Sequence, residues 1–180
     1  MTRGMPSMID TWREKAMTQS PDRIEKQVQL AAPLERVWEA VSNAGEFGTW
    51  FGVAFDGPFV AGQTLFGRIS PTRVDDDVAK AQEPYAGSVF EFVVDRIEPK
   101  RLFSFRWHPF AVDPAFDYAS EPMTLVTFTL AEQAGGTLLT VVESGFDAIA
   151  AARREKAYEM NDEGWAMQMK LIEKYLARSA

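Results

Sequence analysis

The stretch IEKQVQLAAPLERVWEAVSNAGEFGTWF, residues 24–51, decides the fold. In its first seven residues Ile24, Val28 and Leu30 share one parity, and polar residues occupy the other, which predicts a half-buried β-strand. Pro33 suits the first position of a helix, because the N–H that proline lacks would have no partner there. The apolar side chains that follow recur at the spacing of one helix face: Leu34, Val37, Trp38 and Val41.

A second short helix is predicted from Asn43, which can cap it together with Glu46, through about Trp50. Beyond this helix the apolar spacing changes to two, which indicates strands. The predicted strands cover residues 53–56, 63–70, 85–98, 101–108, 123–131 and 137–144. Residues 71–84 and 109–122 are rich in polar residues or proline, and we expect loops there.

Helical spacing returns over residues 147–178, although Asn161 and Asp162 can interrupt or recap the helix. The order is then one strand, two short helices, six antiparallel strands and a long C-terminal helix. Because helices and strands are segregated, the class is α+β. We expect a curved antiparallel sheet of about seven strands that buries one face against the last helix.

This pattern places the domain at residues 23–180 and an N-terminal extension at residues 1–22. Two alternatives stay open for the extension, a short amphipathic helix and a disordered tail; a third is that translation starts at Met17. The apolar residues that suggest the helix are Met5, Met8, Ile9, Trp12 and Ala16. No secretory signal or membrane-spanning run is present, so we expect a cytoplasmic protein.

Composition excludes several classes of protein. The 180 residues include no cysteine and one histidine, which excludes disulfide frameworks, iron–sulfur clusters, cysteine zinc sites and multi-histidine metal sites. The net charge of −7 argues against nucleic-acid binding and against docking on anionic lipid. Phosphate-loop, dinucleotide and nucleophile-elbow motifs are absent, so we expect no cofactor and no metal. The acidic run of residues 75–77 indicates a solvated loop.

Two titratable residues are candidates for a site. Glu143 shares a strand face with Leu139 and Val141, and a carboxylate on an apolar face must be paired, shifted in pKa or turned toward a wet cavity. His108 ends a strand beside Trp107, where it is either a half-exposed terminal residue or a proton donor at a cavity mouth.

The chain contains 22 aromatic residues (13 Phe, 5 Trp and 4 Tyr), an unusual number that indicates large rings lining or filling part of the domain. Either they pack in one core, or sheet and helix enclose an apolar pocket with a few polar groups. In the second case we predict a ligand site that includes the following residues: Trp50, Phe51, Phe103, Phe105, Trp107, Glu143, Trp165, Gln168 and Tyr175.

Several motifs in order resemble one family. They are the opening strand and helix of residues 24–38, FGTWF at 47–51, EPKRLFSFRW at 98–107, VESGF at 142–146 and NDEGW at 161–165. Together they are similar to the SRPBCC superfamily (START-like, helix-grip), in the branch that resembles the activator of heat-shock-protein ATPase. The resemblance covers about residues 23–178 and implies a long helix gripped by a curved sheet, with a cavity between them.

Three functions remain open, because fold alone does not fix function. The leading hypothesis is a non-enzymatic binder of a small hydrophobic or aromatic molecule. The second is a cyclase- or aromatase-like enzyme that uses Glu143 or His108 as acid or base. The third, implied by the resemblance, is a module that contacts a chaperone; a homodimer also stays open.

Overall fold

The computed structural model describes residues 22–178, which form a seven-stranded antiparallel sheet in the order β1-β7-β6-β5-β4-β3-β2. The strands are β1 (Arg23–Leu30), β2 (Val53–Phe55), β3 (Thr64–Ile69), β4 (Val89–Glu98), β5 (Leu102–Trp107), β6 (Thr124–Gln133) and β7 (Gly136–Ser144). The helices are α2 (Leu34–Ser42), α3 (Ala44–Phe51), α4 (Asp76–Gln82) and α5 (Ala151–Arg178). Short 3-10 turns are η1 (Glu83–Tyr85), η2 (Tyr118–Ser120) and η3 (Phe146–Ala148). The predicted α+β architecture is confirmed.

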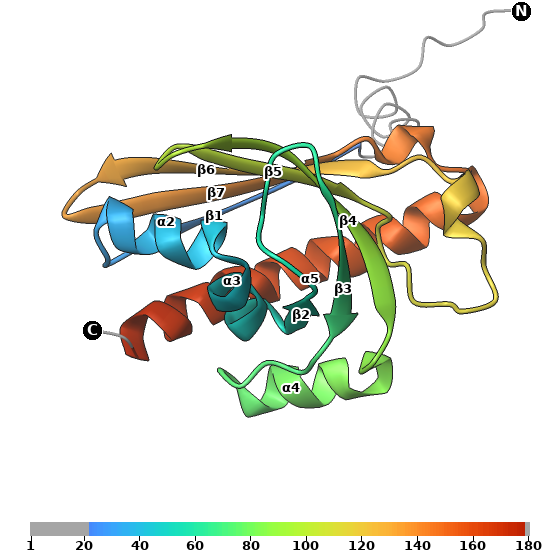
Figure 1. The fold of residues 1–180 in the computed structure, drawn as a ribbon, viewed down its shortest axis with the longest axis horizontal. Coiled ribbons are helices and arrows are strands. Elements are labelled where there is room, and N and C mark those ends of the chain that lie inside the picture. The colour runs from blue at the N-terminus through green and yellow to red at the C-terminus, as the bar shows by residue number, and fades with distance from the viewer. Residues whose placement is uncertain (1–21, 179–180) are drawn as a thin grey trace, which may run out of the picture.

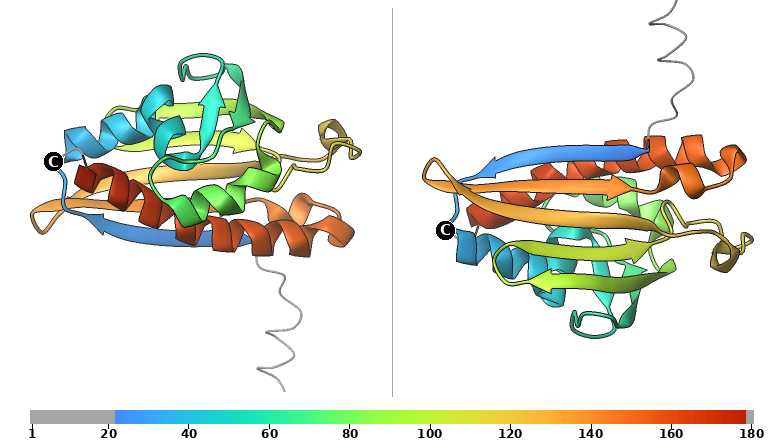
Figure 2. Two further views of the ribbon diagram at one scale, coloured as in Figure 1. Left: turned by 90° about the horizontal axis from the view of Figure 1, so that it is seen from below. Right: turned by 90° about the horizontal axis from the view of Figure 1, so that it is seen from above.

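The α-helices of the described residues lie on one side of the sheet (Figures 1 and 2). The sheet curves over α5, which packs against β1 and α3, while α2 packs against β6 and β7. The other side of the sheet carries no helix of the described part (Figure 2, right). This is the helix-grip arrangement, in which the concave face and the long helix share one core.

Helix α3 begins and ends where its sequence dictates. The Asn43 side chain accepts a hydrogen bond from the Glu46 N–H at 3.0 Å, as the predicted cap requires. Gly52 ends the helix with a φ of 97°, a left-handed conformation that favours glycine, and its N–H bonds to the Gly48 carbonyl. The chain then enters β2, so Trp50 and Phe51 are held between the sheet and α5.

A cluster of aromatic rings lies in the core between the sheet and the helices. Phe92 and Phe105, on neighbouring strands, stack with ring centroids 4.0 Å apart. Phe47 from α3 contacts both rings edge-on. Helix α5 runs unbroken through Asn161. Packing of its buried apolar stripe stabilises the continuous helix more than Asn161 and Asp162 destabilise it. The stripe consists of Trp165, Met169, Ile172 and Leu176.

The expected loop at residues 71–84 is wrong in its middle, where α4 forms. Asp75 caps this helix by accepting from the N–H groups of Asp77 and Val78, so part of the acidic run is capping and not simply solvated loop. Gln82 then anchors the helix, because its side-chain amide donates to the Phe51 carbonyl at 3.0 Å. A seven-residue helix has too few apolar repeats to show periodicity.

The structure also bears on the predicted start of β4, on membrane-spanning helices and on metal-ligand clusters. β4 begins at Val89, four residues later than expected, because Tyr85 belongs to a 3-10 turn. Within residues 22–178, no helix is long and apolar enough to cross a membrane. No cluster of three potential metal ligands occurs in that part of the chain either. The predictions for the N-terminal extension, including its amphipathic helix and the start at Met17, fall on residues 1–21, outside the described residues.

Candidate functional site

Glu143 lies at the centre of a buried hydrogen-bond cluster between β7, β5, β6 and α5. Its carboxylate is fully buried and accepts from four side chains. One oxygen, Oε2, accepts from Trp107 Nε1 at 2.7 Å and from Thr124 Oγ1 at 2.6 Å. The other, Oε1, accepts from Asn161 Nδ2 at 2.8 Å and from Trp165 Nε1 at 2.9 Å. Both oxygens are therefore occupied by donors.

Two opposing effects act on the pKa of the Glu143 carboxyl. Burial raises this pKa, because the charged form loses its hydration. The four hydrogen bonds oppose the shift, because they stabilise the charged form. A carboxylate held in this way orients its donors, since the indole of Trp107 on β5 and the Asn161 amide and Trp165 indole on α5 converge on it.

His108 follows β5 directly and presents a different situation. Its Nδ1 atom is buried and has no hydrogen-bond partner in the described part of the chain. Burial lowers the pKa of the imidazole. Among the charges around it, Glu91 and Glu121 raise the pKa, whereas Arg153 lowers it further. Burial therefore favours the neutral imidazole, and its Nδ1 atom makes no hydrogen bond in the described part of the chain.

A partly enclosed pocket of about 160 Å³ lies beside His108. His108 and Asn161 are its polar side chains, and Asn161 connects it to Glu143 behind the wall. Most of the remaining wall is apolar or aromatic. The lining residues are Phe51, Gly52, Val53, Ile69, Phe90, Trp107, His108, Phe110, Ala111, Val112 and Asn161.

The predicted ligand-binding residues separate into two groups. Phe51 and Trp107 line the pocket, and their rings lie 6.0 Å apart. Four further aromatic residues of the predicted site belong to the core. Trp50, Phe103, Phe105 and Trp165 are at most 2% exposed and do not line this pocket. The aromatic count therefore has two structural uses, a filled core and one pocket wall at its edge.

Gln168 and Tyr175 lie farther along α5. Gln168 donates to the Phe51 carbonyl at 3.0 Å, and its own Oε1 is buried without a partner in the described structure. The Tyr175 hydroxyl donates to Glu46 at 2.6 Å, in a group that also includes Arg36. Burial raises the pKa of Tyr175, and the contact with Glu46 adds to the shift. Neither residue lines the 160 Å³ pocket.

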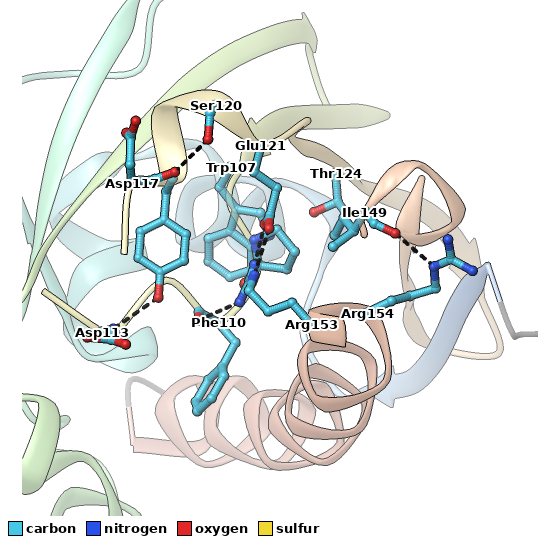
Figure 3. Close-up of polar contacts among 12 residues, drawn as sticks. Trp107, Phe110, Asp113, Asp117, Ser120, Glu121, Thr124, Ile149, Arg153 and Arg154 are labelled. Carbon is cyan, nitrogen blue, oxygen red and sulfur yellow. Dashed lines mark hydrogen bonds and ion pairs between the residues drawn. The ribbon is translucent and has the colours of Figure 1, made fainter. Parts of the chain in front are cut away.

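The segment 109–122 closes one side of the pocket and is held by Arg153 of α5 (Figure 3). The guanidinium pairs with Glu121, with Nε 2.7 Å from Oε2, and donates to the Phe110 carbonyl at 3.1 Å. It also lies 5.0 Å from the Tyr118 ring centroid. Phe110 adopts a φ of 49°, an uncommon conformation for a non-glycine residue that surrounding contacts must maintain.

Sequence reasoning missed Asn161, Thr124 and Arg153 as parts of this region. Asn161 could have been found, because it precedes Trp165 by four residues and so shares its helix face. No sequence signal connects Thr124 with Glu143, or Arg153 with Glu121. Those pairs depend on how the strands and α5 pack in three dimensions.

A larger groove of about 700 Å³ lies elsewhere on the surface, between α3, β2 and residues 70–73. It contains none of the predicted site residues. Its walls are mostly small or polar side chains: Asn43, Ala44, Gly45, Gly48, Thr49, Val53, Ala54, Phe55, Asp56, Gly57, Pro58, Ser70, Pro71 and Arg73.

A curved antiparallel sheet, a long gripped helix and a pocket at their junction define an SRPBCC-type helix-grip domain. Residues 31–177 match the family described as "Activator of Hsp90 ATPase homolog 1-like protein", and the chain belongs to that family. This confirms the resemblance seen in the sequence motifs. No curated protein matches the chain.

Solved structures agree with this assignment. Protein MLL2253 from Mesorhizobium loti is 25% identical, with a TM-score of 0.64 over 88% of this chain and 98% of that one. DynU16, from the dynemicin biosynthetic locus, is 24% identical; its TM-score is 0.62 over 88% of this chain and 48% of its own. The Aha1 dimer from Colwellia psychrerythraea is 14% identical, with a TM-score of 0.58 over 84% and 92%. DynU16 and the Aha1 dimer are less than 25% identical to this chain, so their similarity shows a shared fold alone.

Proposed function

We propose that this domain binds a small, largely apolar molecule in the pocket of about 160 Å³ between the sheet and α5. The observation that carries the proposal is a partly enclosed pocket whose apolar and aromatic wall carries two polar side chains, His108 and Asn161. Ligand sites are typically apolar with a few polar groups that fix orientation.

The size of the pocket limits the ligand. Drug-sized ligands occupy sites of about 300–1,000 Å³, so this pocket is too small for a lipid or a multi-ring molecule in the observed conformation. A cavity of about 150 Å³ accommodates one benzene ring. The ligand that fits is therefore a single ring or a short branched chain. The pocket volume thus restricts the small hydrophobic or aromatic ligand expected from the sequence to its smallest members.

Thermal-shift and native mass-spectrometry screens with single-ring compounds test the proposal. Ala111 lines the pocket, so Ala111→Trp should fill it and abolish the stabilisation that a ligand gives. Ala119 is exposed on the same segment, and Ala119→Trp is the matched control that should retain binding. Equal binding by the two variants would place the ligand elsewhere and reject the proposal.

Acid–base catalysis at the same pocket is the second candidate, and His108 favours it. Its imidazole lines the pocket, and burial lowers its pKa, which favours the unprotonated form that can act as a base. Glu143 is a weaker candidate for the base, because four donors already occupy its oxygens. If a single-ring compound that binds the wild type is also converted by it, His108→Gln should still bind the compound and no longer convert it. That result would support catalysis over simple binding.

Contact with a chaperone is the third candidate, and the family description favours it. On the helix-free side of the sheet, Phe66 and Val89 are 50% and 51% exposed on the paired strands β3 and β4. Exposed apolar side chains on neighbouring strands suit a protein contact. A chaperone ATPase assay with the wild type and Phe66→Ser tests this candidate, since a contact there predicts stimulation by the wild type only.

A further inference from the structure

Strand β2 forms one edge of the sheet, so only β3 pairs with it. On the side of β3, the Gly52 carbonyl and the Asp56 N–H make hydrogen bonds, and Ala54 pairs between them. Residues of antiparallel strands alternate between directing both backbone groups at the neighbouring strand and directing both away from it. Val53 and Phe55 lie between the paired positions, so their N–H and C=O groups point away from β3.

Helix α3 lies on the side of β2 that β3 leaves open (Figure 1). It covers the Val53 carbonyl closely, because a Cβ added at Gly48 would lie only 2.2 Å from that oxygen. The next outward-facing residue is Phe55, and no other group in the described part of the chain bonds to its backbone N–H and C=O. The strand therefore offers one backbone donor and one backbone acceptor on its outer side.

The groove of about 700 Å³ lies on this side of β2. Phe55 lines it from the strand, and Gly45, Gly48 and Thr49 line it from α3. Because these helix residues are small, the groove keeps room beside Phe55, where a further strand would lie about 4.7–4.9 Å from β2. The groove volume is also within the range of about 300–1,000 Å³ that is typical of ligand sites.

The occupant must supply an acceptor for the Phe55 N–H and a donor for the Phe55 carbonyl. A peptide backbone carries both groups, whereas a plain apolar ring carries neither. The charged residues of the groove are Asp56 and Arg73, which are of opposite sign, so the groove favours neither a net anion nor a net cation. The Asp56 carboxylate also accepts from the Phe66 N–H at 3.0 Å, which ties this end of β2 to β3.

We infer that the groove binds an extended peptide segment, which adds a strand to the sheet by pairing with the backbone of Phe55. In this mode of recognition, main-chain hydrogen bonds supply the affinity. Only Val53 lines both this groove and the pocket of about 160 Å³. The inference is therefore independent of the proposed function, and either one can fail without the other.

The test is an NMR titration of the full chain with the capped tripeptide acetyl-Val-Thr-Val-amide, a sequence of high β-propensity. The control is the same peptide with all three residues N-methylated, which keeps the side chains and loses the N–H groups of those residues. The parent peptide should bind at least about fivefold more tightly than this control, the effect of one net hydrogen bond of about 1 kcal/mol. Equal binding of the two peptides, or no saturable binding of the parent, would overturn the inference.

Amide hydrogen exchange locates the contact. The peptide should slow exchange of the Phe55 amide, which gains an acceptor, and should leave the Ala54 amide unchanged, because Ala54 already faces β3. Protection confined to other residues would overturn the inference. The same change at Phe55 when the protein alone is concentrated would also overturn it, because a second copy of the chain would then occupy the groove.

Gly45→Leu should fill the groove and abolish peptide binding, because Gly45 lines the groove from α3. Gly164→Leu on α5 is the matched control and should bind as the wild type does, since a Cβ at Gly164 meets no atom within 4 Å. Equal binding by the two variants would contradict the placement of the peptide beside α3. Should Gly45→Leu fail to fold, the two peptides and the exchange of Phe55 on the wild type decide the question.

Discussion

Glu143 shows how far a single residue can be interpreted from sequence. Its apolar strand face indicates that the carboxylate must be paired, shifted in pKa or turned toward a cavity, and the structure combines pairing with a raised pKa. The nearest of its four partners in sequence is Asn161, 18 residues away. Periodicity describes one element at a time, so it could not identify donors supplied by other elements.

Glu143→Gln should destabilise the fold by about 1–3 kcal/mol. A glutamine presents an N–H₂ group to at least one donor pair and leaves those donors unsatisfied. Urea unfolding at pH 7 measures the effect as a lower midpoint. Glu132→Gln, at an exposed position near the end of β6, is the matched control and should leave the midpoint unchanged. A midpoint for Glu143→Gln equal to the wild type would contradict the structural role of this cluster.

His108 should titrate below its ordinary pKa of about 6.5, because burial disfavours the charged imidazole. Between the folded-state and unfolded-state pKa values, the folded protein binds fewer protons than the unfolded chain. The stability contributed by this shift is therefore complete above pH of about 6.5 and is lost as the pH falls through the folded-state pKa.

NMR gives this pKa directly, since His108 is the one histidine of the sequence and its ring resonance is unambiguous. The free energy of unfolding of His108→Gln should also approach that of the wild type more closely at pH 5 than at pH 7.5. A titration midpoint at or above about 6.5 would contradict a pKa that is set mainly by burial of the ring.

At the scale of elements, the sequence predicts those with clear periodicity and misses those held by side-chain anchors. The longer strands and the helices α2 and α5 show a repeat, whereas α3 is predicted from its Asn43 cap. Helix α4 is short and depends on its Asp75 cap and on Gln82. The segment 109–122 depends on contacts with Arg153, which lies more than 30 residues farther along the chain.

Arg153→Ala should release the segment 109–122. The variant loses charge-assisted hydrogen bonds to Glu121 and to the Phe110 carbonyl, each typically worth about 1.5–3 kcal/mol. Amide hydrogen exchange in this segment should therefore accelerate by about tenfold or more. Arg154→Ala is the control, because Arg154 instead donates to the Ile149 carbonyl (Figure 3). It also donates to the Asp147 carbonyl. Similar exchange in the two variants would contradict a specific role for Arg153.

At the scale of the molecule, the fold was predictable because its features agree. The alternating strands, the capped short helices and the C-terminal apolar stripe all indicate one sheet with helices on one face. Which aromatic side chains fill the core and which line the pocket was not predictable from the sequence. The sequence places Phe103, Phe105 and Trp107 on one strand face, but the first two are core and only Trp107 reaches the pocket. Whether a ring fills space or borders it depends on the curvature of the sheet and the position of α5.

The most direct measurement for the central claim is a map of amide and indole chemical-shift changes on the full chain, during titration with a neutral single-ring compound. The account predicts saturable shifts centred on Phe51, Trp107, Ala111 and Asn161, with Ala111→Trp abolishing them. Shifts centred instead on the groove beside α3, or no saturable shifts with any single-ring compound, would contradict it.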